Sequence, residues 1–438
     1  MSDLAKTPDT DKVQAATGTA VDAEPSATPA AAVDPRLLVR EQGFAGYWSE
    51  FVRKIRGGEL GSLPVVVGLI VIALVFQLQN DKFLSASSLA NIAVFTSGVG
   101  IMSVGIVFVL LLGEIDLSVG SVAGVGAAVW AVLSVTHGWG DWLSVFVAIA
   151  SGLVIGALHG FFFAKIGVPA FVVTLAGFLG WSGLQIWLMG KEGSINTPTG
   201  SVVEDLTTHF FADKAAAYGL ALIAVLAYGA SQYLDARRRK NAELPSRPLS
   251  EILLRTGLLA VLAFVAAYFL NEPEGARGLP LALVLFLAVL VIADFVARRT
   301  TFGRQVFAVG GNAEAARRAG INVDRVRITV FAISGMLAAF GGLFIASLSG
   351  GATKSLGAGN TLMMVIAAAV IGGTSLFGGR GKIWSAMLGM LVIQSIQQGL
   401  NLEGMPNEIQ YMITGAVLLA AVVIDSVSRK TQKSAGRA

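Results

Sequence analysis

Apolar residues along this chain gather into long runs that are separated by short polar segments. Runs of about 17 to 25 residues are long enough to cross the hydrocarbon core of a bilayer as helices. The pattern therefore predicts an all-α fold, a polytopic helical bundle in a membrane. We expect about 10–12 transmembrane helices, because glycine and polar residues within some runs suggest one or two broken or re-entrant helices. The runs lie at 62–78, 88–112, 117–135, 142–164, 168–190, 215–234, 251–270, 280–297, 327–349, 361–377, 383–400 and 408–426.

The composition agrees with a membrane protein. Hydrophobic residues make up 54% of the chain and charged residues only 14%, against about 25% charged in a typical soluble protein. The 52 glycines suit helices that pack closely within a membrane. The chain has no cysteine, which excludes disulfides, thiolate metal sites and cysteine nucleophiles.

The distribution of lysine and arginine predicts the orientation. With the N-terminus on the cytoplasmic side, the inner segments carry 27 of the 32 basic residues and the outer segments carry 5. Such an excess on one side is the pattern of the positive-inside rule. We therefore expect a multi-pass membrane protein with both termini in the cytoplasm.

The two ends of the chain differ from the apolar middle. Residues 1–56 are expected to be a disordered cytoplasmic tail, because the first 35 residues are rich in Ala, Pro, Thr and Asp. Aromatic and basic residues near its end suit either an interfacial helix or a simple lead-in to the first span. Residues 57–428 form the predicted transmembrane domain, and 429–438 a short cytoplasmic tail.

The basic segment 298–327 is a predicted cytoplasmic loop that carries a short helix. Asn312 is a suitable N-cap, good helix formers follow it, and Gly320 lies where a glycine commonly ends a helix. Glu314 in the first turn suits the helix dipole, as do the arginines of the last turn, Arg317 and Arg318. From the residues alone, the segment is either an ordinary loop between spans or a docking helix for a soluble partner.

Catalytic chemistry has little support in the sequence. The three histidines form no metal-binding spacing, and no GxSxG elbow occurs. The glycine-rich Gly378–Lys382 fails as a phosphate loop, because Lys382 is followed by Ile383 instead of Ser or Thr. We therefore expect neither an enzyme nor a metal site.

A polar cluster, Gly113–Ser121, interrupts a very apolar stretch. Asp116 is a candidate N-cap of the following helix. Carboxylates near membrane depth often face a cavity or a partner, so a role in a translocation path is a compatible alternative. Amides within spans are more commonly helix–helix hydrogen bonds than ligand contacts. The candidates for the path are Asn91, Glu114, Asp116, Ser118 and Gln394.

The outer segment Lys191–Asp213 is the longest predicted external loop. It is polar, and it could contact an external partner. A plain linker is the default expectation for such a segment.

Three sequence blocks resemble a known family, the permeases of bacterial ATP-binding-cassette sugar importers of the ribose and xylose type. They are GEIDLSVGS at Gly113–Ser121, AVGGNAEAARRAGINV at Ala308–Val323, and IAAAVIGGTSLFGGRG at Ile366–Gly381 followed by QGLNL. The chain resembles the xylose permease branch most. Near Leu362–Met364 it lacks the Glu-Leu-Asp of ribose-type members, and residues 205–270 add two spans that those members lack.

The resemblance implies an importer permease of the bacterial inner (cytoplasmic) membrane, in the type II arrangement. It implies a permease homodimer with two cytoplasmic ATPase subunits, which bind the ATP, and a periplasmic sugar-binding protein. The substrate would be a monosaccharide, D-xylose or a related pentose. No cofactor is implied on this chain itself. The segment 298–327 would be the coupling loop, with its ATPase contact at Gly310, Gly311, Asn312, Glu314, Arg317 and Arg318.

An alternative is an ion-coupled secondary sugar transporter, which also uses broken helices and buried carboxylates. It would require no ATPase partner. A membrane-bound enzyme is disfavoured, since no nucleophile or metal constellation is present.

Overall fold

The computed structural model describes residues 63–244, 246–271 and 276–434. These residues belong to one compact unit, Gly58–Ala438. The predicted N-terminal tail, residues 1–56, lies outside the described residues.

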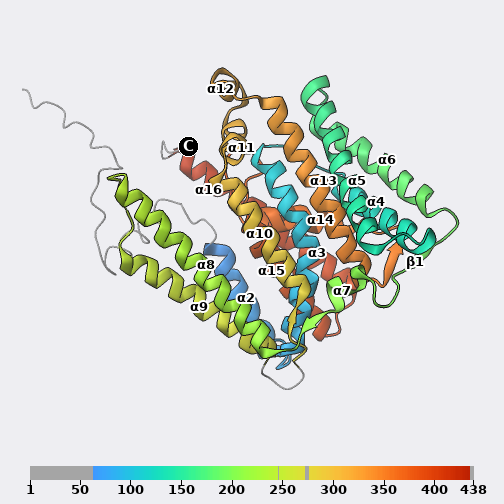
Figure 1. The fold of residues 1–438 in the computed structure, drawn as a ribbon, viewed down its shortest axis with the longest axis horizontal. Helices are drawn as coiled ribbons and strands as arrows, with labels where there is room; N and C mark the ends of the chain where they lie inside the picture. The colour runs from blue at the N-terminus through green and yellow to red at the C-terminus, as the bar shows by residue number, and fades with distance from the viewer. Residues whose placement is uncertain (1–62, 245, 272–275, 435–438) are drawn as a thin grey trace, which may run out of the picture. The chain divides into compact units, whose positions relative to one another are not determined.

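Each of the twelve predicted apolar runs coincides with a helix (Figure 1). Within the described residues, eight helical segments have the length and hydropathy of a membrane span. α4 and α5 each continue into a short π-helical segment, which completes the span. The eight are α3 (Ala86–Leu111), α4 (Val119–Ala131, continued to Thr136), α5 (Asp141–Phe161, continued to Ile166), α6 (Ala170–Met189), α8 (Lys214–Asn241), α9 (Leu249–Asn271), α10 (Leu281–Arg299) and α13 (Val323–Leu348).

Three of the other apolar helices in the described residues do not meet those criteria. α2 (Leu63–Gln79) and α14 (Asn360–Ile371) are short, and α15 (Ser385–Leu402) contains more polar residues. The last apolar helix, α16 (Asn407–Ser434), is 28 residues long. α14 ends well before the end of its predicted run at residue 377. The reason is local, because Gly373 adopts a φ of 98° and leads the chain into an irregular segment before α15.

The core of the bundle is built on α3 and α13. α3 is almost entirely buried, and α13 packs against α3, α4 and α5. Glycines bring α5 and α13 into backbone contact: a Cβ on Gly335 would lie 2.2 Å from the Gly152 carbonyl oxygen, and one on Gly156 would lie 2.1 Å from that of Phe331. Such close approach is how helices associate where the hydrophobic effect offers little drive.

α8 and α9 lie side by side and bury little of their surface (Figure 1). Only 11% of the best apolar window of each helix is buried. Their exposed side chains include Leu222, Ile223, Leu253, Leu258 and Val261. An apolar exposed surface of this kind suits contact with lipid. These two helices fall within the 205–270 segment, in which two additional spans are predicted.

The segment Lys191–Asp213 is folded, so the expectation of a plain linker is wrong. It contains β1 (Ser194–Asn196), the helix α7 (Val202–Thr208) and β2 (Phe210–Phe211). β1 pairs with β4 (Gly351–Thr353), and β2 pairs with β3 (Leu279–Pro280), both antiparallel. The segment is therefore attached to the connections that follow α9 and α13.

Asp141 anchors α7 to the bundle. Its carboxylate accepts hydrogen bonds from the indole nitrogen of Trp130 and the hydroxyl of Ser134, each at 3.0 Å, and from the backbone N–H of Val202. On the other side of α7, Thr207 hydrogen-bonds to Ser347 of α13 at 2.6 Å. One carboxylate thus joins α4, α5 and α7.

Candidate functional site

The segment between α10 and α13 forms two short helices. α11 (Thr301–Gly311) begins at Thr300, whose hydroxyl accepts from the Gly303 N–H at 3.2 Å. α12 (Ala313–Arg318) begins at Asn312, whose side chain accepts from the Ala315 N–H at 2.9 Å. The predicted short helix and its N-cap are therefore confirmed, while α11 is an additional helix.

The end of α12 follows the predicted pattern as well. Gly320 has a φ of 82°, and the N–H of Ile321 donates to the Ala316 carbonyl at 3.0 Å. A left-handed glycine with this bond is a usual helix C-terminus. Asn322 then caps α13 by accepting from the Arg325 N–H at 2.9 Å. α12 therefore lies between two capped helices. It needs such support because a helix of six residues is not stable on its own.

The charged side chains of α12 are exposed and pair with one another. Glu314 lies 3.1 Å from Arg318 and 3.8 Å from Arg317, and all three side chains are more than half exposed. Exposed pairs of this kind contribute little to stability. Asn312 and Gly311 are exposed too, whereas Gly310 is partly buried against the end of α3. The face formed by Gly311, Asn312, Glu314, Arg317 and Arg318 is available to a partner.

The Gly113–Ser121 segment lies between α3 and α4, at the same end of the bundle as α11 and α12 (Figure 1). Asp116 is not the N-cap of α4. That position belongs to Ser118, whose side chain makes no capping bond. Instead, one Asp116 oxygen accepts from the N–H and the hydroxyl of Ser118, at 2.9 and 2.6 Å, and the other accepts from the Ser334 hydroxyl at 3.1 Å. The carboxylate therefore joins the α3–α4 connection to α13.

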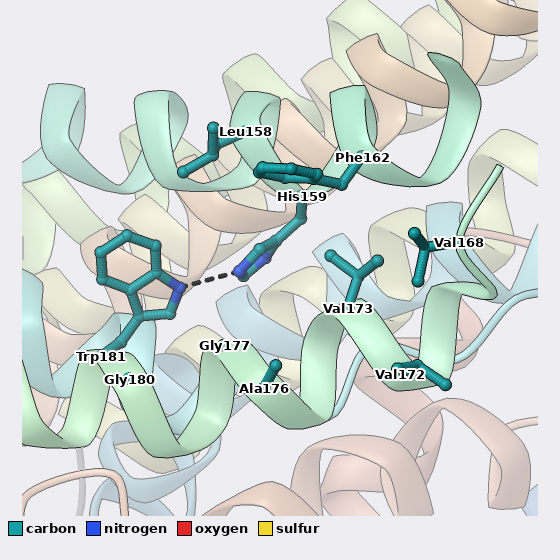
Figure 2. A pocket seen from close by; sticks show the side chains of 10 residues that line it. All are labelled: Leu158, His159, Phe162, Val168, Val172, Val173, Ala176, Gly177, Gly180 and Trp181. Atoms are coloured by element: carbon teal, nitrogen blue, oxygen red, sulfur yellow. Dashed lines mark hydrogen bonds between the residues drawn. The ribbon is translucent and has the colours of Figure 1, made fainter. Parts of the chain in front are cut away.

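A chain of hydrogen bonds continues from Asp116 to α5 and α6. The Ser118 hydroxyl lies 3.2 Å from Nδ1 of His159, and the indole N–H of Trp181 donates to His159 Nε2 at 2.8 Å, as Figure 2 shows for the second bond. An indole nitrogen only donates, so Nε2 is an acceptor and the ring proton is on Nδ1. The Ser118 hydroxyl then accepts a hydrogen bond from the Nδ1–H of His159 and donates one to Asp116. We call Asp116, Ser118, His159, Trp181 and Ser334 the buried polar chain.

The burial of this chain explains why it is fully bonded. Asp116 and His159 are each 3% exposed, and Ser118 and Ser334 are 0% exposed. Unpaired polar groups at such depth are costly. His159 is one of the three histidines whose spacing in the sequence predicts no metal site. The signal that could have identified it is the occurrence of a lone histidine and a tryptophan in neighbouring apolar runs.

A hydrophobic pocket of about 420 Å³ lies between α5 and α6 beside His159 (Figure 2). Leu158, Phe162, Val172 and Val173 contribute apolar walls. His159 and Trp181 are the polar side chains among its lining residues, and their facing ring nitrogens are already bonded to each other. This pocket is therefore poorly suited to a polyhydroxylated ligand.

The other predicted path residues do not gather at this place. Glu114 is half-buried near Arg327, and burial raises the pKa of its carboxyl while the Arg327 charge opposes the rise. Arg327 itself stacks on Phe163, with its guanidinium carbon 4.4 Å from the ring centre. Asn91 is near the opposite end of α3, about 30 Å from Leu111 by helix geometry, and Gln394 is buried on α15.

Two amide side chains within apolar helices form hydrogen bonds to other segments of the bundle. Gln185 of α6 donates to the carbonyls of Thr353 and Leu356, at 2.8 and 3.1 Å. Gln398 of α15 donates to the Ser88 hydroxyl of α3 at 3.1 Å. The Gln398 bond agrees with the expectation that such amides connect helices. The Gln185 bonds instead join α6 to β4 and the turn that follows it.

Comparison with known proteins places these features in a family. Residues 88–422 match the family model described as branched-chain amino acid transport system / permease component. The chain is 36% identical over 368 residues to the xylose transport system permease protein XylH of Escherichia coli, which covers 84% of this chain and 92% of that protein. No solved structure matches.

Two further relatives extend the comparison. The corresponding XylH protein of Haemophilus influenzae is 35% identical over 84% of this chain and 98% of its own length. The ribose import permease protein RbsC of Escherichia coli is 29% identical over 82% of this chain and 92% of its own length. These matches go against the ion-coupled alternative. The chain belongs to this permease family and is a membrane component of an ABC transporter that is not itself catalytic.

Proposed function

We propose that this chain forms the translocation path for a monosaccharide, D-xylose or a related pentose, in an ATP-driven import system. The observation that carries the proposal is the 36% identity to a xylose permease across 84% of the chain. The ribose permeases are less similar, at 27–29% identity. The inserted pair α8–α9 also supports the xylose branch over the ribose branch.

The proposed assembly is a permease homodimer in the inner membrane with two cytoplasmic ATPase subunits. ATP binds to those subunits, and a periplasmic binding protein delivers the sugar. The exposed face of α12 supports the ATPase contact, because its charged side chains pair with one another and present both signs of charge to a partner. With α12 in the cytoplasm, both termini lie there too.

The test begins with purification of the chain from its own membranes in a mild detergent. We expect an ATPase with a phosphate-loop sequence to co-purify with the unaltered protein. Glu314→Arg should reduce the recovered ATPase about tenfold, since reversing one central charge at an interface commonly costs more than 1.4 kcal/mol. Glu243→Arg is the matched control, because Glu243 is an exposed glutamate outside the proposed contact, in the connection after α8.

Substrate identity is tested on the complex in proteoliposomes with its binding protein. ATP-dependent uptake of labelled xylose that exceeds uptake of ribose and of leucine supports the proposal. Leucine is included because the family model is described by branched-chain amino acids. Uptake driven by a proton gradient without an ATPase, or a preference for leucine, would overturn it.

A further inference from the structure

Three backbone segments that are far apart in the sequence meet at the end of α3. They are the end of α3 itself with Gly113, the end of α11 at Gly310, and the turn at Phe377–Gly379. The N–H of Gly379 donates to the carbonyl of Leu111 at 2.9 Å. This bond joins the turn before α15 directly to α3.

Glycines make the approach of these segments possible. A Cβ on Gly310 would lie 1.7 Å from the Leu111 carbonyl oxygen and 2.9 Å from the Gly379 nitrogen. A Cβ on Gly378 would lie 2.7 Å from the Gly310 oxygen and 2.9 Å from the Gly113 nitrogen. Gly113 and Gly378 also have φ angles of 81°, which disfavour any side chain. We call Gly113, Gly310, Gly378 and Gly379 the glycine junction.

The glycine junction is adjacent to the helix that faces the partner. Gly310 precedes Asn312, the N-cap of α12, by two residues. On the other side, Gly113 precedes Asp116 of the buried polar chain by three residues, and that chain contacts α5, α6 and α13. Backbone packed against backbone leaves no flexible side chain to absorb a displacement.

We propose that the glycine junction is the point at which force on α12 enters the membrane helices. The end of α3 and the turn before α15 then move with α11 as one unit. This inference rests on the proposed contact between α12 and an ATPase. Gly310 is accordingly a positioning residue for coupling and makes no contact with the partner itself.

A helical glycine far from the junction provides a matched control. Gly257 lies within α9, its φ is not positive, and a Cβ there would meet no atom of the described residues within 4 Å. Gly310→Ala and Gly257→Ala are therefore the same chemical change in a blocked and an open helical position.

The first experiment uses the complete transporter with its ATPase subunits in proteoliposomes. We expect Gly310→Ala to co-purify with the ATPase but to transport about tenfold less substrate per ATP hydrolysed. Gly257→Ala should remain within about twofold of the unaltered protein. Equal effects of the two substitutions, or normal coupling in Gly310→Ala, would overturn the inference. Failure of the unaltered chain to bind an ATPase would instead overturn the proposed function.

A second measurement keeps the junction intact, in case Gly310→Ala does not fold. The chain has no cysteine of its own, so two cysteines can be introduced into one chain to carry a pair of spin labels. We measure the distance between positions 304 on α11 and 382, on opposite sides of the junction, and between 304 and 240 at the end of α8. On ATP binding we expect the first distance to stay within about 2 Å while the second changes by more. Any other result overturns the inference.

Discussion

At the scale of single residues, Ser118 has the most demanding position in the buried polar chain. Its hydroxyl accepts a hydrogen bond from the Nδ1–H of His159 and donates one to Asp116 at 2.6 Å. Its backbone N–H donates to the same carboxylate. Removing the hydroxyl leaves His159 Nδ1 without its acceptor in a fully buried place. An unsatisfied buried polar group typically costs about 1–3 kcal/mol.

Ser118→Ala should therefore lower the free energy of unfolding by about 1–3 kcal/mol, measured by denaturation in mixed detergent micelles. Ser121→Ala is the control, because its buried hydroxyl bonds only to the Ser118 carbonyl in the adjacent turn, at 2.8 Å. We expect the control to lose less than about 1 kcal/mol. A larger loss in Ser121→Ala would contradict the assigned role of Ser118.

The sequence could predict part of this site for a physical reason. Asp116 stands out because a carboxylate within an apolar stretch is expensive, which marks it without showing what satisfies it. Its partner Ser334 lies 218 residues away along the chain, and His159, which bonds to Ser118, lies 43 residues away. Only the packing of α5 and α13 against the α3–α4 connection brings them together. The prediction of Asp116 as an N-cap was wrong because the N-cap of α4 is Ser118, two residues later, and the Asp116 oxygens bond to Ser118 and to Ser334 of α13.

At the scale of elements, local signals predicted α12 well and α7 not at all. α12 has an N-cap and a terminal glycine close together in sequence. α7 has comparable local chemistry: the Ser201 side chain accepts from the Glu204 N–H at 3.1 Å, and Glu204 accepts from the Gly200 N–H. That resembles a capping box. Its seven residues carry too short an apolar pattern to be distinguished from a loop, and α7 is held by Asp141 and Ser347.

Asp141→Asn should loosen α7 with little effect elsewhere. The amide retains one acceptor oxygen but places an NH₂ group where one of the three donors now points. We expect hydrogen exchange of the α7 amides to accelerate about tenfold, which corresponds to the loss of about 1.4 kcal/mol of local stability. Asp205→Asn, an exposed change on α7 itself, is the control. Unchanged exchange in Asp141→Asn would show that α7 is held by its other contacts.

At the scale of the whole molecule, the apolar pattern located the twelve predicted apolar helices, but it did not show how much of each helix is buried inside the bundle. Periodicity and length identify a helix that can cross a membrane. They do not distinguish α3 from α9. In the most apolar stretch of α3, 94% of the residues are buried inside the protein, against 11% in that of α9. Both helices are strongly apolar, because lipid and protein interior accept the same side chains. Their different surroundings follow from packing, with α3 at the centre and α9 at the edge.

The orientation predicted from the basic residues has a direct test at this scale. Single cysteines are introduced at positions 194 and 355, on the β1–β4 side, and at 243 and 314 on the other. An impermeant maleimide should label 194 and 355 in spheroplasts with intact membranes, and 243 and 314 only after permeabilisation. The absence of native cysteine keeps the background low. Labelling in the reverse pattern would place the termini outside.

The direction of the bonds in the buried polar chain matters for a membrane that stores energy as a proton gradient. A buried aspartate and histidine in sequence are the usual parts of a proton relay. Here a proton cannot be passed on beyond His159. The Nε2 lone pair of His159 accepts a hydrogen bond from Trp181, and an indole N–H can donate a hydrogen bond but cannot accept a proton. A proton that reached Asp116 would stop at the ring. The same bonds that hold four segments together thus leave this chain of groups without a proton acceptor at its Trp181 end.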